Sequence, residues 1–472
     1  MQRRFITKSV LLGAFFALIM ALPIGQAFAQ GSTTSALSGT VVDEKGEGLP
    51  GATVIAIHEP TGSRYGASTR GDGRYNIVNM RVGGPYKVTI SFVGYKESVQ
   101  SGISLTLASE LRQNFKLELN QAQLEEVKVV ASRSSVINSG RTGAATTVSN
   151  SSITTLPTLN RSLGDFARLD PRANGLNFAG RNALYNNVTV DGAFFNNAFA
   201  LSPTIGGQAG ASPISVDAID QFQVLIAPYD VRQGMATGAN INVVTKSGTN
   251  DWTGSAYYFG TNENQVGNKI GDAVSQYGKF QRGQFGGRIG GAIIKNKLFV
   301  FGSFEQELQT QPGSNFVAAR PGSTAGNQSV ATAAQLDQIK DFLKSKYNYD
   351  PGAYENWDRI NYSQKANVRL DWNISDKHKF NLKYNYLRSY SDVPPSSSGS
   401  LTGGRNPSAT VLPFQGSLYR INNNLDSYIA ELNSTLSSTV ANNLTVGYTQ
   451  MRDFRQSPVN NTPFPTVDIG NN

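Results

Sequence analysis

Apolar and polar residues alternate along several short stretches between residues 37 and 119. In the clearest stretch the polar residues Lys87, Thr89 and Ser91 separate the apolar residues Tyr86, Val88, Ile90 and Phe92. This period of two is typical of a β-strand with one buried face. Hairpin-turn sequences at 43–46 and 71–73 separate such stretches, and a last alternating strand is expected over 111–119. The pattern predicts a β-sandwich of about seven strands within residues 30–119.

Longer alternating stretches fill the chain from residue 252 onward. We expect seven strands there, near 252–260, 281–293, 298–308, 362–374, 379–390, 425–438 and 443–455. In the fourth strand, Val368, Leu370, Trp372 and Ile374 alternate with Asn367, Arg369, Asp371 and Asn373. In the fifth, Phe380, Leu382, Tyr384 and Tyr386 alternate with Asn381, Lys383 and Asn385. Alternation over about ten residues suits a strand that crosses a bilayer beside a wet interior, although a soluble sandwich can show the same pattern.

The connections between these strands separate the two possibilities. Short connections at 295–297, 375–378 and 441–442 alternate with long polar ones at 261–280, 309–361 and 391–424. Outer-membrane barrels have short periplasmic turns and long outer loops, so the pattern indicates a transmembrane antiparallel β-barrel. A short amphipathic helix is expected at 333–346, within the second long loop.

The predicted strand number is too small for a finished barrel. Bacterial barrels have an even number of strands, and closure removes both sheet edges. A barrel of about eight strands is filled by side chains, whereas a lumen that holds a folded plug calls for about 22 strands. We therefore expect residues 251–472 to be the first part of a larger barrel, and the sequence to be the N-terminal part of a longer protein.

Residues 134–250 mix helical and strand patterns and predict an α+β domain. A helix is expected at 162–169, and strands at 187–190, 219–225 and 238–246, the first of them ending in an Asp191-Gly192 turn. A polar linker within 120–133 precedes this domain and contains the β-prone residues Leu124, Glu125, Glu126, Val127, Lys128, Val129 and Val130. Such a segment could add to the edge of another protein's sheet, or be only the first strand of the following domain. The fold class is thus mainly β, in three parts.

The N-terminus predicts export from the cytoplasm. Arg3, Arg4 and Lys8 precede a short apolar run over 10–22, and small residues lead to Ala29 and Gln30. This order is typical of a cleaved secretory signal over residues 1–29, with cleavage between Ala29 and Gln30. The run is shorter than the roughly 20 apolar residues of a comfortable membrane span.

Composition excludes several classes of protein. The 472 residues include no cysteine, which excludes disulfide scaffolds, thiolate zinc sites and thiol catalysis. The net charge of +9 is spread along the chain without a basic block, so we expect no nucleic-acid partner. His58 and His378 are the only histidines, and neither lies in a metal-binding pair. No serine-nucleophile motif is present, so we expect no catalytic residue, metal or cofactor and no enzyme.

Two short motifs are better explained as turns. Gly46, Gly48 and Gly51 fit a dinucleotide-binding spacing, but Pro50 interrupts it and strands, not a helix, follow. The Arg-Gly-Asp tripeptide at 70–72 falls where a hairpin needs glycine and aspartate.

The sequences GTVVD at 39–43, GLPGATV at 48–54 and GDGRYNI at 71–77 resemble the regulatory-like domain of carboxypeptidases. This resemblance implies a transthyretin-like sandwich.

The sequences NVTVDG at 187–192, IDQFQVL at 219–225 and GANINVVTK at 238–246 resemble the plug of TonB-dependent outer-membrane transporters of the Oar-like branch. The sequence departs from that pattern at Gln223, where the family has glutamate, and at Ile226 and Ala227, which replace a basic residue and glycine. These departures weaken any residue-level claim about salt bridges between plug and barrel.

The resemblance implies an outer-membrane protein with its sandwich and plug on the periplasmic side. Residues 124–130 become the candidate segment that contacts TonB. The implied partners are TonB with its inner-membrane energy complex, outer-membrane lipid and an unknown extracellular ligand, and the implied function is energised uptake of a scarce or bulky ligand. The alternative is a cell-surface adhesin or matrix-assembly channel whose sandwich binds carbohydrate or peptide.

Overall fold

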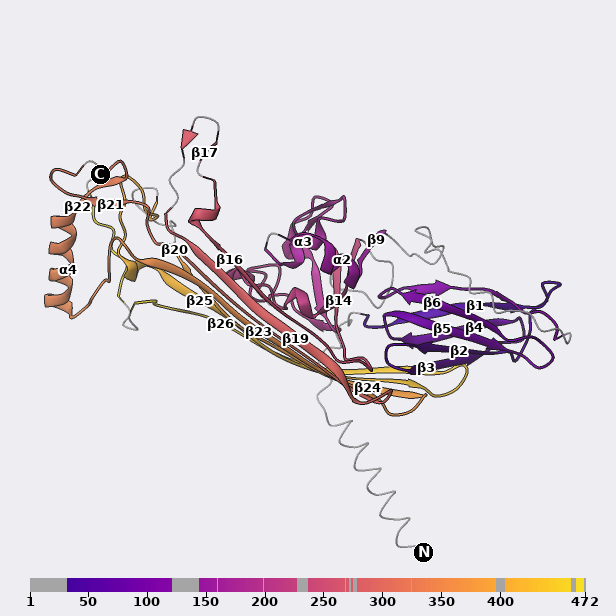
Figure 1. Ribbon diagram of the computed structural model, residues 1–472. Helices are drawn as coiled ribbons and strands as arrows, with labels where there is room; N and C mark the ends of the chain where they lie inside the picture. Colours follow the sequence, from indigo (N-terminus) through magenta and orange to yellow (C-terminus); the bar gives the residue numbers. More distant parts are fainter. Residues whose placement is uncertain are drawn as a thin grey trace, which may run out of the picture.

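The computed structural model describes residues 32–120, 144–158, 160–197, 199–226, 237–267, 269–270, 273–274, 278–323, 325–395, 404–459 and 464–470. In chain order they form a β-sandwich, a mixed domain and a curved sheet of long strands (Figure 1). We call residues 144–250 the plug domain and the seven long strands the barrel sheet. The plug domain lies against the barrel sheet, and the sandwich lies at the end of the sheet that carries the short turns.

Two sheets face each other in the sandwich. One has the order β4-β1-β7, with β8 also paired to β1, and the other has the order β3-β2-β5-β6. The strands are β1 (Ser35–Val42), β2 (Thr53–His58), β3 (Ser63–Ser68), β4 (Arg74–Met80), β5 (Gly83–Ser91), β6 (Ser98–Leu105), β7 (Glu110–Arg112) and β8 (Phe115–Lys116). The predicted alternation in β5 is confirmed, because Tyr86, Val88 and Ile90 are fully buried in the core.

The prediction of one continuous strand over 111–119 was wrong. β7 and β8 are two short strands, both parallel to β1, and Gln113 and Asn114 separate them. The cause lies at Gly39, where a β-carbon would stand 1.7 Å from the carbonyl oxygen of Gln113. The backbone at Gln113 therefore lies directly over Gly39, the one residue of β1 without a side chain, and the expected strand is interrupted at Gln113 and Asn114.

The plug domain is built around a five-stranded sheet with the order β13-β12-β15-β14-β9. The predicted strands at 187–190, 219–225 and 238–246 are confirmed, whereas the helix expected at 162–169 covers only 163–167. The elements are β9 (Ala144–Val148), α2 (Asn150–Thr155), α3 (Leu163–Ala167), β10 (Ala173–Asn174), β11 (Asn177–Phe178), η1 (Ala183–Tyr185), β12 (Asn187–Val190), β13 (Ala193–Phe194), η2 (Gly207–Ala209), η3 (Val216–Ala218), β14 (Ile219–Ile226) and β15 (Ala239–Thr245).

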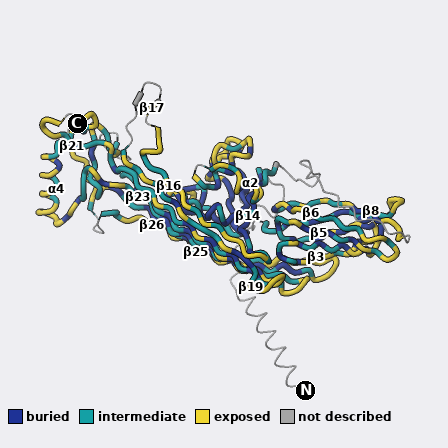
Figure 2. The backbone as a smooth tube through the Cα atoms, in the orientation of Figure 1, coloured by how far each residue is buried: buried dark blue, intermediate teal, exposed yellow. Residues whose placement is uncertain are grey.

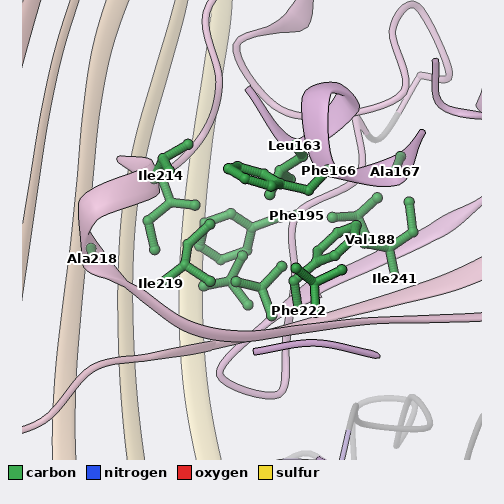
Figure 3. Packing of buried hydrophobic residues seen from close by; sticks show 14 of the residues in the cluster. Leu163, Phe166, Ala167, Val188, Phe195, Ile214, Ala218, Ile219, Phe222 and Ile241 are labelled. Atoms are coloured by element: carbon green, nitrogen blue, oxygen red, sulfur yellow. The ribbon is translucent and has the colours of Figure 1, made fainter. Parts of the chain in front are cut away.

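One face of this sheet forms the hydrophobic core of the plug domain. Val188, Phe222 and Ile241 pack there with Phe166 from α3 and Phe195 (Figure 3). The barrel sheet adds three residues to this core, Phe301, Leu387 and Leu425. The plug domain is therefore packed onto the inner wall of the barrel sheet but has a core of its own.

The barrel sheet has the seven predicted strands in sequential antiparallel order. They are β16 (Thr253–Asn262), β19 (Gln281–Ile294), β20 (Leu298–Pro312), β23 (Asp358–Asn373), β24 (His378–Val393), β25 (Tyr419–Thr435) and β26 (Ala441–Gln456). Short turns and long connections alternate between them as expected. Within the described residues, β16 and β26 each pair with one neighbour in this sheet.

The long connections gather at the end of the barrel sheet away from the sandwich (Figure 1). The predicted helix is present as α4 (Ala333–Tyr347), capped by Thr332, whose hydroxyl accepts a hydrogen bond from the Gln335 N–H. The other elements there are η4 (Glu263–Gln265), β17 (Lys269–Ile270), β18 (Ala273–Val274), β21 (Val317–Ala319), β22 (Gln328–Thr332) and η5 (Gln415–Ser417).

Burial alternates along the strands of the barrel sheet, as the sequence pattern predicted; Figure 2 colours the backbone by burial. Val368 and Trp372 in β23 are 47% and 42% exposed, whereas Arg369 and Asp371 between them are buried. Polar side chains thus face the plug domain, and apolar ones face outward, as lipid requires.

No helix in the described part of the chain is both long and apolar enough to cross a membrane.

Candidate functional site at the junction of the three parts

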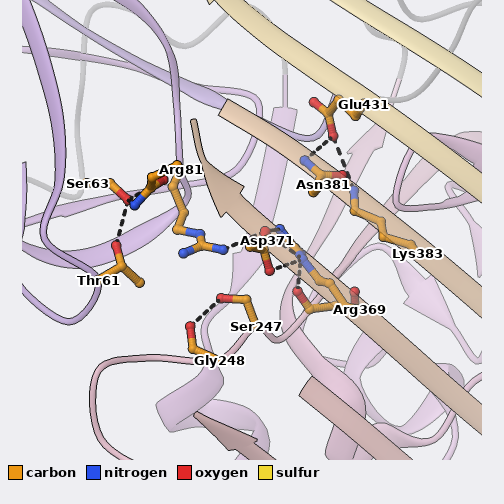
Figure 4. Close-up of polar contacts among 12 residues, drawn as sticks. Thr61, Ser63, Arg81, Ser247, Gly248, Arg369, Asp371, Asn381, Lys383 and Glu431 are labelled. Atoms are coloured by element: carbon orange, nitrogen blue, oxygen red, sulfur yellow. Dashed lines mark hydrogen bonds and ion pairs between the residues drawn. The ribbon is translucent and has the colours of Figure 1, made fainter. Parts of the chain in front are cut away.

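The sandwich, the plug domain and the barrel sheet meet around a cleft of about 250 Å³ (Figure 4). Charged side chains from all three parts lie in or beside it; those of the plug domain and the barrel sheet include buried ones, and Arg81 of the sandwich is half-buried. A buried charge is costly unless it is paired and hydrogen-bonded, so this cluster marks a place where the three parts depend on one another.

The plug domain contributes Asp191, in the turn between β12 and β13. Asp191 and Gly192 both have positive φ angles, 53° and 87°, which an Asp-Gly pair adopts readily in a tight hairpin turn. The carboxylate is fully buried. Its two oxygens accept hydrogen bonds from the backbone N–H and the hydroxyl of Thr245, at 3.1 and 2.7 Å. The turn therefore fixes Asp191 where it faces the barrel sheet.

Two cations of the barrel sheet face this carboxylate. Lys383 Nζ lies 3.6 Å and Arg369 Nη1 3.9 Å from Asp191 Oδ1. Arg369 Nη1 also donates a hydrogen bond of 2.7 Å to the backbone carbonyl of Thr245. The barrel sheet thus holds the ends of β12 and β15 with two ion pairs and one charge-assisted hydrogen bond.

Both cations also have partners within the barrel sheet. Arg369 contacts Asp371, two residues along β23, with Nη2 2.9 Å from Oδ1. Lys383 Nζ lies 3.2 Å from Glu431 Oε2 on the neighbouring strand β25. Each cation is therefore shared between a carboxylate of the barrel and the carboxylate of the plug.

The sandwich completes the cluster. Arg81, which follows β4, approaches Asp371 with Nη2 2.7 Å from Oδ1. Thr33, just before β1, donates its hydroxyl to Glu431 Oε1 at 2.7 Å. Among the side chains that these contacts join, three cations (Arg81, Arg369 and Lys383) balance three carboxylates (Asp191, Asp371 and Glu431). Asp220 and Lys246 of the plug domain also line the cleft and add one acidic and one basic group.

A second contact joins the sandwich directly to the plug sheet. Gln221 Oε1 accepts a hydrogen bond of 2.8 Å from the Leu107 N–H, and its Nε2 donates to the Leu105 carbonyl at 3.2 Å. Gln223 Nε2 donates to the Leu107 carbonyl at 2.6 Å. Leu107 also packs with Val82 and Val244 in a small buried cluster. The two glutamines of β14 therefore hold the segment after β6 as a neighbouring strand would.

Further polar contacts hold the plug domain inside the barrel sheet. The Ser215 hydroxyl donates to Glu305, which Lys365 also contacts, at 2.7 and 2.6 Å. Asp217 lies 3.4 Å from Arg288. Lys246 Nζ donates to the Asp217 carbonyl at 2.9 Å, and burial lowers the pKa of Lys246 to about 8. The side of the plug that meets the barrel is thus largely polar, apart from three core contacts.

The structure does not describe the residues that the sequence predicted as sites. Residues 124–130, the candidate TonB-contacting segment, and the cleavage pair Ala29 and Gln30 lie outside the described residues. In the described ranges, no group of three or more histidine, aspartate and glutamate side chains is placed to hold a metal ion.

The sequence analysis did not identify the junction as a site. It placed Arg369, Asp371 and Lys383 on the polar face of their strands. The charges on that face were the one feature of the sequence that could have indicated a site there. Gln223, noted as a departure from the glutamate of the family, contacts the sandwich and not the barrel. The ion pairs between plug and barrel come instead from Asp191 and Asp217.

Two protein families match parts of the chain. Residues 36–118 match the carboxypeptidase regulatory-like domain, which coincides with the sandwich. Residues 244–471 match an outer membrane beta barrel domain, which contains the barrel sheet. A curated relative, the TonB-dependent transporter Oar of Myxococcus xanthus, is 28% identical over 297 residues. The chain thus combines a carboxypeptidase regulatory-like domain with an outer membrane beta barrel domain and is similar to a TonB-dependent transporter. It is an outer-membrane protein.

The alignment with Oar covers 59% of this receptor chain and 27% of the relative. Among solved structures, the outer membrane transporter YddB from Escherichia coli is 14% identical with a TM-score of 0.46, over 66% of this chain and 40% of that one. The siderophore receptor PirA from Acinetobacter baumannii is 13% identical with a TM-score of 0.41, over 69% and 43%. The receptor chain thus spans less than half of the length of each of these relatives.

Proposed function

We propose that this receptor takes up a scarce or bulky extracellular ligand across the outer membrane, that TonB delivers the energy, and that no covalent chemistry is involved. The observation that carries the proposal is the way in which the plug domain is held. Asp191 and Thr245 attach it to Arg369 and Lys383 through ion pairs and a hydrogen bond, and only three apolar residues of the described barrel sheet join its core. Such contacts can break and re-form when a force acts on the plug, because water replaces each partner.

The relatives support the same proposal. Oar is named as a TonB-dependent transporter, YddB as an outer membrane transporter and PirA as a siderophore receptor. Their names describe those proteins, and the ligand of this receptor is not readable from its fold. The receptor would act through binding surfaces rather than catalytic residues, with the long connections outside the cell and the sandwich and plug in the periplasm.

Residues 124–130 are the proposed point of contact with TonB. A segment recognised by strand addition depends mainly on its backbone hydrogen bonds. Proline removes a backbone N–H and interrupts a strand ladder, whereas alanine keeps both. In the full-length receptor, Val127→Pro and Val129→Pro are therefore expected to abolish binding of the purified periplasmic domain of TonB, and Val127→Ala and Val129→Ala to retain it.

The measurement is capture of that TonB domain by detergent-solubilised receptor, followed by uptake in cells. Retained TonB binding in both proline variants would show that residues 124–130 are a linker or the first strand of the plug. Val99→Pro in β6 is the control for a proline that damages the sandwich, since Val99 pairs with Thr89 there. It is expected to lower the stability of the sandwich without abolishing TonB binding.

A further inference from the structure

The sandwich contacts both of the parts that must separate if the plug is to move. On the plug side, Gln221 and Gln223 bind the backbone after β6. On the barrel side, the Ser63 hydroxyl and the Asn373 amide nitrogen lie 2.9 Å apart, and Asn79 Nδ2 donates to the Asn442 carbonyl at 3.2 Å. The sandwich thus bridges the plug domain and the short turns of the barrel sheet.

We propose that the sandwich is a lock on the plug, and that it must leave the junction before the plug domain can be released. The inference rests on the proposed function, because it describes how that function would be regulated. Two observations support the inference: the contacts of the sandwich with both parts, and the charge imbalance that withdrawal of Arg81 would leave.

Withdrawal of Arg81 removes one cation from a buried cluster whose charges balance. Two cations, Arg369 and Lys383, would then face three carboxylates, Asp191, Asp371 and Glu431. Asp371 would have Arg369 as its remaining partner, and Arg369 is the residue that also holds Asp191 and Thr245 of the plug. Excess negative charge among buried groups is costly, and release of Asp191 with the plug restores the balance. Undocking of the sandwich therefore favours release of the plug.

The interface has the composition of a contact that opens. Its buried apolar part is small, consisting of Val82, Leu107 and Val244. The other contacts among the described residues are hydrogen bonds, one ion pair and the ammonium of Lys379 over the Tyr65 ring, 4.2 Å from its centroid. Water can replace these polar partners when the sandwich withdraws. A permanent interface would bury a larger apolar area.

The first test measures the coupling without any transport. Amide hydrogen exchange of β14 and β15 is followed by mass spectrometry in the purified full-length receptor, in the wild type, Arg81→Ala and Arg74→Ala. Arg74 is a matched control because it is an exposed sandwich arginine paired with Asp72 of its own domain. We expect exchange in β14 and β15 to become at least about tenfold faster in Arg81→Ala, because Asp371 loses a charged partner, and to be unchanged in Arg74→Ala.

The strands of the sandwich supply an internal check in the same experiment. If β2 and β5 stay protected while β14 and β15 exchange faster, the effect comes from undocking, and the lock is supported. Unchanged exchange in β14 and β15 would overturn the inference, and so would faster exchange of β2 and β5 to the same degree, which would report an unfolded sandwich.

The second test closes the lock covalently. Because residues 1–472 contain no cysteine, Ser63→Cys with Asn373→Cys adds one pair of thiols to this part of the receptor, across the sandwich–barrel contact. Bridging the pair with a short, reducible cross-linker is expected to stop uptake and to leave TonB binding intact, and reduction should restore uptake. Uptake by the bridged receptor at the wild-type rate would overturn the lock. A wild type that neither binds TonB nor takes up ligand would instead overturn the proposed function, and the exchange experiment would still decide on the lock.

Discussion

Acid should destabilise the sandwich through one side chain, His58. This histidine ends β2 and is buried, with Nδ1 2.7 Å from the Thr61 hydroxyl and its ring 4.9 Å from that of Tyr86. Burial, with a smaller contribution from the nearby Arg81 charge, lowers the pKa of His58 to about 3. The folded sandwich therefore keeps the ring neutral at a pH where the unfolded chain binds a proton.

The sign and size of the effect follow from linkage. Between the ordinary histidine pKa of about 6.5 and the folded value, the unfolded state binds more protons, so stability falls as the pH falls. The loss is about 1.4 kcal/mol per pH unit, or about 2 kcal/mol at pH 5 relative to pH 7. Above pH 6.5 this contribution of the neutral ring is fully present.

The assay is urea unfolding of the 30–119 sandwich at several pH values between 4 and 8, for the wild type and His58→Gln. Glutamine keeps a polar group near Thr61 but does not titrate, so the difference between the two profiles isolates His58 from the carboxylates. We expect the difference in the free energy of unfolding to shrink on acidification, because only the wild type loses the stability of a neutral imidazole. Parallel profiles would refute the reasoning, since His58 would then titrate alike in the folded and unfolded states.

Two other expectations concern packing and topology. Gly39→Ala should lower the free energy of unfolding of the sandwich by about 2 kcal/mol or more, because the added β-carbon would collide with the Gln113 carbonyl. Gly66→Ala is the control and should be tolerated, because the nearest atom to its β-carbon would be 3.5 Å away. Equal stability of the two variants would contradict the close approach. An epitope inserted after Gly322 should be reached by antibody on intact cells, and one after Gly46 should not; the opposite labelling would invert the proposed topology.

Local periodicity predicted most of the fold, because the side chains of a strand alternate whatever surrounds it. Val368 and Arg369 fell on opposite faces of β23 as expected, and the Asp191-Gly192 turn closes its hairpin as expected. The interruption between β7 and β8 could not be predicted, since it arises from Gly39 on another strand. Alternation indicates which face of the sheet a side chain occupies, but it does not indicate which strand pairs with that residue.

The junction escaped prediction for a related reason. Arg81 follows a strand of a small sandwich, and nothing in its neighbourhood along the chain indicates a partner 290 positions away at Asp371. Gln223 was compared with the glutamate of a family pattern, which concerns the barrel, whereas Gln221 and Gln223 both contact the sandwich. Such contacts depend on how whole domains dock, which a periodic pattern does not encode.

The two faces of the plug sheet suit the proposed release of a folded domain that sits in the barrel. Its apolar face is covered mainly by the plug itself, so movement of the plug as a unit exposes little apolar surface. The other face carries Gln223, Asn240 and Asn242, all buried. Among the described residues, both amide atoms of Asn240, Nδ2 of Asn242 and Oε1 of Gln223 have no hydrogen-bond partner. A buried polar atom without a partner is unfavourable, and it gains a hydrogen bond as soon as water enters. Hydration of this face therefore favours the separation that the sandwich, through Gln223 and Arg81, opposes.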